Sequence, residues 1–275
     1  MWHFMKSCVE PAALAGKRIV VIGGTAGLGL SAVKAFVAAG AKVVAVGLKP
    51  ENVASAQKEA GDSAIMICGD ASRAETAIAA VEKAVATFGG LDGLYHVAGG
   101  SGRRWGDGPL HEITDEGWDA TFKLNLTSLF YSNRAAVRQF LKQGTGGTVL
   151  NTGSVLGFSP SHKYFSTHAY ASAKAAIVGL TKSCAGFYAP LHIRFNVLAP
   201  AVTDTPMAQR AVNDEAILAF VKTKQPLDGG RVGQPSDLDA AAVYFMSDAS
   251  KFTTGQVLAV DGGWCVSEGQ IPATP

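Results

Sequence analysis

The sequence contains few of the features that mark secreted, membrane-spanning or metal-binding proteins. Only four of its 275 residues are cysteines, at positions 8, 68, 184 and 265, and their spacing matches neither a disulfide framework nor a zinc site. No apolar run reaches the roughly 18 residues that a membrane-spanning helix needs, and residues 1–7 do not form a signal peptide. A cytoplasmic protein with reduced thiols, no metal and no membrane contact is therefore expected.

Charged residues are also scarce, and the two signs are balanced. They make up 17% of the chain, the formal net charge is +2, and no cluster of lysines and arginines with interleaved aromatics occurs. A nucleic-acid partner is therefore not expected. No linker rich in proline or serine and no internal repeat divides the chain, whereas 48% of the residues are apolar. This composition predicts one compact domain.

The alternation of short and long segments predicts an α/β fold. Short β-branched runs alternate with longer alanine-rich segments of helical period, which is typical of a doubly wound (Rossmann-type) parallel sheet with helices on both faces. The seven predicted strands are 18–22, 42–46, 64–68, 93–97, 147–152, 193–198 and 256–260. The clearest predicted helices are 28–39, 73–88, 115–142, 169–188 and 235–246.

The predicted domain runs from residue 16 to residue 264. An N-terminal arm, 1–15, precedes it and a C-terminal tail, 265–275, follows it. Between the sixth and seventh strands lies a long segment, 201–233, that contains Pro206, Pro226 and the pair Gly229-Gly230. Such an insertion at the carboxyl end of a sheet commonly covers a ligand, so this segment is expected to be a lid.

A glycine-rich turn follows the first predicted strand directly. The segment Gly23-Gly24-Thr25-Ala26-Gly27-Leu28-Gly29 leads from that strand into an amphipathic helix. The backbone N–H groups and the dipole at a helix N-terminus favour an anion, and glycines let a pyrophosphate approach closely. Because strand, turn and helix occur in the required order, the turn predicts a dinucleotide site.

Tyr170 and Lys174 are four residues apart in a predicted helix. Residues at this spacing share a helix face, so the Lys174 charge is expected to lower the pKa of Tyr170 and suit it to acid–base catalysis. Taken alone, the pair could equally be a surface tyrosine above a solvated lysine. The glycine turn upstream favours the catalytic interpretation.

With these motifs in this order, residues 16–264 resemble the classical short-chain dehydrogenase/reductase family. The resemblance implies a single seven-stranded sheet and a homodimer or homotetramer formed through the two long helices that flank the active site. It also implies a catalytic set without metal, made of Asn125, Ser154, Tyr170 and Lys174. Ser154 ends the fifth strand sixteen residues before Tyr170, so the loop between them is expected to be enlarged; Ser159 and Ser161 are rival candidates.

The resemblance also implies a set of cofactor-binding residues, among which Ile22 and His96 depart from the family pattern. Ala98 and Gly99 are expected to lie flat against the cofactor, and the backbone of Val202 is expected to meet the nicotinamide carboxamide. The full set is Gly23, Thr25, Gly27, Leu28 and Gly29 at the phosphates, Gly47, Leu48 and Lys49 at the adenosine ribose, Asp70 and Ala71 at the adenine, and Ala98, Gly99, Tyr170, Lys174, Pro200, Val202 and Thr205 around the nicotinamide.

The choice between NAD and NADP depends on the end of the second strand. Gly47 stands where an acidic residue would bind the ribose hydroxyls of NAD. Without that carboxylate a 2′-phosphate is not repelled, and Lys49 could pair with it, which favours NADP. Lys49 could also be a solvated loop charge, so NAD stays open.

The expected reaction is reversible hydride transfer between the nicotinamide and a carbonyl or secondary alcohol carbon, with Tyr170 as general acid and base. The substrate is expected to bind between loops 101–111, 158–168 and 201–230. These loops carry aromatic residues (Trp105, Phe158, Tyr164, Phe165) and cations (Arg103, Arg104, His162, Lys163, His168). An anionic substrate is one interpretation of the cations, and solvated loops are the other.

The alternative activities are a 3-oxoacyl thioester reductase of fatty-acid type and a non-catalytic dinucleotide sensor or scaffold.

Overall fold

The computed structural model describes residues 12–269 and confirms the predicted fold. Its seven strands form one parallel sheet in the order β3-β2-β1-β4-β5-β6-β7. The strands are β1 Arg18–Ile22, β2 Lys42–Gly47, β3 Ala64–Cys68, β4 Gly93–His96, β5 Gly147–Thr152, β6 Ile193–Pro200 and β7 Val257–Val260. The order reverses between β1 and β4, and this reversal opens a crevice at the carboxyl ends of the strands, where ligands bind in such sheets.

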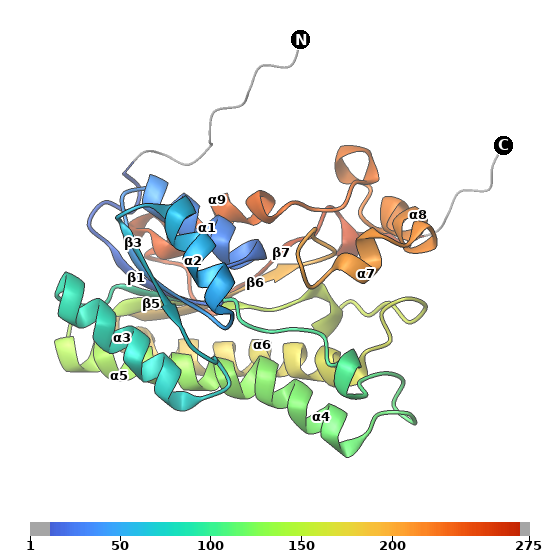
Figure 1. Ribbon diagram of the computed structural model, residues 1–275, viewed down its shortest axis with the longest axis horizontal. Helices are drawn as coiled ribbons and strands as arrows, with labels where there is room; N and C mark the ends of the chain where they lie inside the picture. The colour runs from blue at the N-terminus through green and yellow to red at the C-terminus, as the bar shows by residue number, and fades with distance from the viewer. Residues whose placement is uncertain (1–11, 270–275) are drawn as a thin grey trace, which may run out of the picture.

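Helices cover both faces of the sheet (Figure 1). One face carries α1 Gly27–Ala38, α2 Pro50–Ala60 and α9 Asp239–Met246, and the other carries α3 Ala74–Phe88, α5 Ser128–Gln143 and α6 His168–Tyr188. Alternate residues of β1 enter different cores, because successive side chains of a strand point to opposite faces: Ile19 and Val21 pack on the α1 side, Val20 and Ile22 on the α3 side. Burial on both faces explains why the strands read as continuous apolar runs.

One predicted helix is divided into two. The expected helix 115–142 consists of α4 Asp115–Phe122, a π-helical turn at Lys123–Thr127, and α5. Thr114 caps α4 as expected, since its hydroxyl accepts the Gly117 N–H at 2.9 Å. The π turn contains Asn125, and such turns are frequent at functional sites.

The ends of the predicted lid meet in space. Thr203 and Gly233 form an isolated parallel bridge, and between them lie α7 Gln209–Val212 and α8 Glu215–Lys224. The segment therefore leaves the sheet at the end of β6 and returns close to the same point.

At the N-terminus the folded domain begins earlier than residue 16. Leu14 is fully buried and its N–H donates to the Ala39 carbonyl oxygen. Residues 1–11 of the predicted arm and residues 270–275 of the predicted tail lie outside the described residues.

Candidate active site

Two hollows lie next to each other at the carboxyl ends of the strands. A groove of about 320 Å³ follows the glycine turn, and a pocket of about 400 Å³ lies beneath the lid. Leu28, Thr205 and Met207 line both, so the hollows adjoin. A ligand in the groove can therefore reach a second molecule in the pocket.

The groove begins at the N-terminus of α1. Among the described residues no side chain caps this helix, and its first turn contains no acidic residue, so its N–H groups and dipole face the groove without a protein anion. Gly29 lies directly behind the turn, where an added Cβ would stand 1.9 Å from the Gly23 carbonyl oxygen. The turn therefore needs glycine to bring helix and strand together, and it leaves its backbone open to a pyrophosphate.

Of the seventeen predicted cofactor-binding residues, twelve line the groove, Tyr170, Pro200 and Val202 line the adjoining pocket instead, and Gly29 and Lys174 line neither hollow. Those that line the groove are Gly23, Thr25, Gly27, Leu28, Gly47, Leu48, Lys49, Asp70, Ala71, Ala98, Gly99 and Thr205. Asp70 Oδ1 also accepts the Ser72 N–H at 2.8 Å, so the same side chain shapes its own loop. Asn52, at the start of α2, lines the groove and was not predicted, because the motifs carry no signal for it.

Gly47 is required by its neighbour Thr25. A Cβ at Gly47 would lie 1.9 Å from Thr25 Oγ1 and 2.7 Å from Thr25 Cβ, and Thr25 is itself buried. An acidic residue at position 47 is therefore sterically incompatible with threonine at position 25. The absence of a carboxylate at the end of β2 therefore goes together with the threonine at position 25.

Ser154 and Tyr170 share a wall of the pocket. Ser154 follows the end of β5 and is buried, while Tyr170 lies in the first turn of α6. Lys174 is one helical turn further along α6, only 4% exposed. Its Nζ donates to the Thr152 carbonyl oxygen at 2.9 Å and lies 5.6 Å from the centre of the Tyr170 ring. The predicted helix face is therefore present.

The charges in this group are set mainly by burial. Burial raises the pKa of Tyr170 to about 12, and the hydrogen bond from Ser154 opposes that shift. Burial also lowers the pKa of Lys174 to about 8. The net shift of the Tyr170 pKa is therefore upward, opposite to the expected direction, because desolvation of the phenolate is the largest effect. Residue spacing alone could not reveal that desolvation.

Asn125 connects the π turn to the loop after β4. Its Nδ2 donates to the carbonyl oxygens of Gly100 and Thr121, both at 2.9 Å, and its Oδ1 accepts the Gly100 N–H at 3.1 Å. A Cβ at Gly99 would stand 2.8 Å from Asn125 Oδ1 and 3.4 Å from Lys174 Nζ. Gly99 therefore leaves the approach between these two polar groups open, as a flat cofactor requires.

His96 supports the same loop from below. It is 1% exposed, its Nδ1 pairs with Ser132 Oγ at 2.8 Å, and its Nε2 faces the Ala98 carbonyl oxygen at 3.0 Å. Because a carbonyl only accepts, we assign the proton to Nε2. Burial, and then the charge of Lys174, lowers the pKa of His96 to about 3. The imidazole ring is therefore neutral, and it supports the loop through its hydrogen bond to the Ala98 carbonyl oxygen.

Asp107 anchors the start of α6, a role that the sequence did not predict. The N-cap residue Thr167 makes no side-chain cap. Instead, Asp107 Oδ1 accepts the Ala169 N–H and Oδ2 accepts the Tyr170 N–H, both at 3.0 Å. A buried carboxylate from a loop 63 residues away thus fixes the backbone of Tyr170 and complements the helix dipole.

Both backbone groups of Val202 already have a hydrogen-bond partner in the protein. The Gln225 side chain accepts the Val202 N–H at 2.9 Å and donates to the Val202 carbonyl oxygen at 3.2 Å. Val202 and the next residue, Thr203, both line the pocket. Within the described residues, the Thr203 backbone has only a 3.4 Å contact from Thr205 Oγ1 to its carbonyl oxygen, so it is the less occupied of the two.

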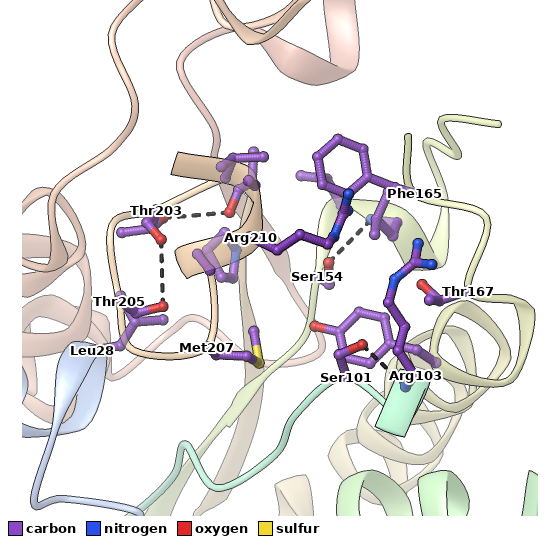
Figure 2. A pocket seen from close by; sticks show the side chains of 18 of the residues that line it. Leu28, Ser101, Arg103, Ser154, Phe165, Thr167, Thr203, Thr205, Met207 and Arg210 are labelled. Carbon is purple, nitrogen blue, oxygen red and sulfur yellow. Dashed lines mark hydrogen bonds between the residues drawn. The ribbon is translucent and has the colours of Figure 1, made fainter. Parts of the chain in front are cut away.

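The pocket uses fewer of the predicted loop residues than expected. Arg103, Arg104 and Phe165 line it, whereas Trp105, Phe158, Tyr164, His162, Lys163 and His168 do not. Trp264 and Arg210 complete it (Figure 2 shows Arg210). Trp264 was missed because it follows β7, far from the predicted loops, and Arg210 because the lid had no recognisable cation motif.

Within residues 12–269, no group of histidine, cysteine and acidic residues is placed to bind a metal ion. In the same part of the chain, none of the helices combines the length and the apolar character needed to span a bilayer.

The groove and the pocket together define a class of protein. A glycine turn against an uncapped helix, beside a pocket that presents serine and tyrosine hydroxyls, is the site of a nicotinamide-dinucleotide-dependent oxidoreductase. Residues 23–265 match a family model described as enoyl-(acyl carrier protein) reductase. The chain belongs to the short-chain dehydrogenase/reductase family, and it acts on CH–OH or C=O groups.

Three similar proteins illustrate the range of this family. The chain is 34% identical to 3β-hydroxysteroid dehydrogenase 2 of Eggerthella lenta, over 91% of this chain and 95% of that protein. It is 35% identical to 2,5-dichloro-2,5-cyclohexadiene-1,4-diol dehydrogenase of Sphingobium indicum, over 91% and 98%. The structure of 3-ketoacyl-(acyl-carrier-protein) reductase from Brucella melitensis, complexed with NADH, matches with a TM-score of 0.82 and 27% identity, over 92% and 100%.

Proposed function

We propose that this enzyme interconverts a ring-sized secondary alcohol and its ketone, with Tyr170 as the general acid and base. One observation carries the proposal: the hydroxyls of Ser154 and Tyr170 share a wall of the apolar pocket that adjoins the dinucleotide groove. The names of the steroid and cyclohexadienediol dehydrogenases, both of which denote ring alcohols, support the substrate class.

The residues divide the chemistry in a simple way. The bound dinucleotide supplies or accepts the hydride. Ser154 and Tyr170 hold the substrate oxygen and stabilise the negative charge that develops on it during reduction. The Tyr170 hydroxyl then gives its proton to that oxygen, and in oxidation the same atom takes a proton back. Lys174, held by Thr152, keeps a positive charge near the phenolate at the moment when it forms.

The groove residues fit the dinucleotide by their shape. The uncapped start of α1 takes the pyrophosphate, and Gly99 leaves room above Asn125 and Lys174 for the nicotinamide ring and its ribose. We propose that the backbone of Thr203, in place of Val202, meets the carboxamide. Pro200 and Thr205 complete that end of the site.

We further propose that NADP is preferred over NAD. Gly47 and Thr25 exclude a carboxylate at the adenosine ribose, and Lys49 and Asn52 line the same end of the groove. A 2′-phosphate would gain a charge-assisted contact from Lys49. The ratio of kcat/KM for NADPH and NADH tests this preference, and a ratio below one would contradict it.

A homotetramer, or a homodimer as the smaller alternative, is the proposed assembly. Phe130 on α5 and Phe187 on α6 are 41% and 73% exposed, on the helices through which the family assembles. The chain mass of 28.4 kDa makes the states easy to separate by light scattering; a monomer would contradict the proposal. The cytoplasmic location expected from the sequence stays a prediction that cell fractionation can test.

The decisive experiment compares wild type with Tyr170→Phe on a cyclic ketone. The variant keeps the aromatic ring of residue 170 but lacks the hydroxyl that donates the proton. We therefore expect cofactor binding within about twofold of wild type and kcat lowered by about 10²–10⁴-fold. Near-normal turnover would overturn the mechanism. Acetoacetyl-coenzyme A serves as the competing substrate: a strong preference for it would favour a 3-oxoacyl thioester reductase, the activity named for the similar Brucella melitensis structure.

A further inference from the structure

Two arginines from different segments meet at the mouth of the substrate pocket. Arg103 comes from the loop after β4 and Arg210 from α7 in the lid, and both side chains are exposed. The Nη2 atoms of Arg103 and Arg210 lie 3.4 Å and 2.9 Å from the same oxygen, the carbonyl of Tyr164. Figure 2 shows the two side chains extending from opposite sides toward the space above Ser154.

The charges of these arginines are not neutralised by the described part of the protein. No carboxylate within residues 12–269 forms an ion pair with either guanidinium. The charge of Asp107 raises the pKa of Arg103, but both carboxylate oxygens of Asp107 already accept N–H groups of α6. Partial desolvation of the exposed Arg103 side chain, and then repulsion from Arg210, lowers the pKa of Arg103. Two like charges are thus held together around one neutral acceptor.

The neighbouring Arg104 stacks its guanidinium on the Trp105 ring at 3.9 Å, closer than the 5.7 Å between the Arg210 guanidinium and the centre of the Phe165 ring. Below the arginine pair, the pocket is apolar. Its walls include Leu28, Val155, Phe165, Met207, Ala211 and Trp264. Ser154 and Tyr170 form its polar wall. A molecule that fits all three zones has an apolar body, an oxygen at one end and an anion at the other.

We propose that the substrate carries a carboxylate, remote from the reacting carbon, that binds between Arg103 and Arg210. Guanidinium groups bind carboxylates through paired N–H donors, and an anion between them removes their mutual repulsion. Arg210 belongs to the lid, so the same contact joins the lid to the loop that carries Asp107. The inference rests on the proposed ketone reductase activity, whose substrate class it narrows.

The test uses pairs of probes that differ only in charge. Reduction of 3- and 4-oxocyclohexanecarboxylate is compared with reduction of the corresponding oxocyclohexanecarboxamides, in wild type and in Arg103→Gln, Arg210→Gln and the double variant. Lys222→Gln, which removes an exposed cation of the lid outside the pocket, is the control. Arg103→Lys and Arg210→Lys keep the charge and guard against misfolding, and circular dichroism checks each variant.

For wild type we expect kcat/KM to favour the acid by about 10- to 100-fold, since each charge-assisted contact is worth about tenfold. Each glutamine variant should lose most of that preference, so that its ratio of kcat/KM for acid and carboxamide falls toward one. The preference should also fall with added salt, because the site is exposed. Equal activity of wild type on acid and amide would overturn the proposal.

Three further outcomes separate the alternatives. If the variants lose activity on acid and amide equally, the arginines only latch the lid to Tyr164, and the proposal fails. If turnover of acetoacetyl-coenzyme A needs both arginines, they bind a phosphate of the coenzyme A, and this result also overturns the proposal. If no ketone turns over, calorimetric binding of cyclohexanecarboxylate to the cofactor-loaded enzyme decides: arginine-dependent binding keeps the anion site although the proposed activity fails, and its absence overturns the site.

Discussion

The backbone N–H of Tyr170 donates to the carboxylate of Asp107 over 3.0 Å, although the two residues belong to different segments of the chain. The same carboxylate accepts the Ala169 N–H. The start of α6 is therefore fixed by the loop that also carries Arg103. This contact links the proposed acid–base residue to the rim of the substrate pocket.

Replacing Asp107 tests this link. Asp107→Ala leaves two buried N–H groups without acceptors, so we expect the free energy of unfolding to fall by about 1–3 kcal/mol and kcat to fall because Tyr170 loses its fixed position. Asp107→Asn keeps one good acceptor and should recover most of both. Urea denaturation and steady-state kinetics measure the two effects; loss of stability with unchanged kcat would leave Asp107 a purely structural cap.

Lys174 is expected to cost stability. Its pKa is lowered by burial to about 8, so between pH 8 and its ordinary 10.5 the unfolded chain binds more protons than the folded one. The free energy of unfolding therefore rises with pH through that window, and the full cost, about 3 kcal/mol, is present below pH 8.

Lys174→Met removes this charge. We expect the variant to be more stable than wild type at pH 7 by about 1–3 kcal/mol, less so at pH 9.5, and nearly inactive at both. Part of the gain is offset because the Thr152 carbonyl oxygen loses its donor. Urea denaturation at the two pH values provides the measurement, and a variant less stable than wild type at pH 7 would show that the ammonium is well compensated.

His96 is expected to make the fold sensitive to acid. Its pKa is lowered to about 3 in the folded protein, so between pH 6.5 and 3 the unfolded state binds the extra proton and stability falls as the pH falls. His96→Asn removes this group while its amide can still donate to the Ala98 carbonyl oxygen. When the pH is lowered from 7 to 4.5, the free energy of unfolding of the variant should fall by about 2–3 kcal/mol less than that of wild type.

The comparison between the two proteins cancels the carboxylates that titrate in both. His96→Leu is the matched control, since it also removes the titration but cannot support Ala98. We expect it to raise the KM of the cofactor, whereas His96→Asn should not. Identical acid profiles for wild type and His96→Asn would contradict the neutral, buried histidine.

Gly47 and Thr25 are expected to change cofactor preference only together. Gly47→Asp alone places a side chain against Thr25, because even its Cβ would lie 1.9 Å from Thr25 Oγ1. We therefore expect weaker binding of both cofactors. Gly47→Asp with Thr25→Gly removes the collision and presents a carboxylate to the ribose, which should favour NADH over NADPH by about tenfold or more relative to wild type. Kinetics with both cofactors provide the measurement; a single Gly47→Asp variant that binds NADH well would contradict the pairing.

The parts of the protein that follow local rules were predictable. Each of the seven strands lies within two residues of its predicted bounds, because buried parallel strands are short apolar runs between glycine or proline signals. The glycine turn lies at the groove, Ser154 and Tyr170 line the pocket, and Lys174 lies one helical turn beyond Tyr170 in α6, since a motif fixes the positions of neighbours in the chain.

What the sequence by itself determined, then, is the sheet, the dinucleotide groove and the order of the catalytic candidates. The tertiary structure decided the rest: that Asp107 holds Tyr170, that Arg210 joins Arg103, and that Trp264 closes the pocket. It also reversed the expected shift in the Tyr170 pKa. Contacts between distant segments and the loss of water around a buried group arise only when the whole chain packs, and no local pattern of residues encodes them.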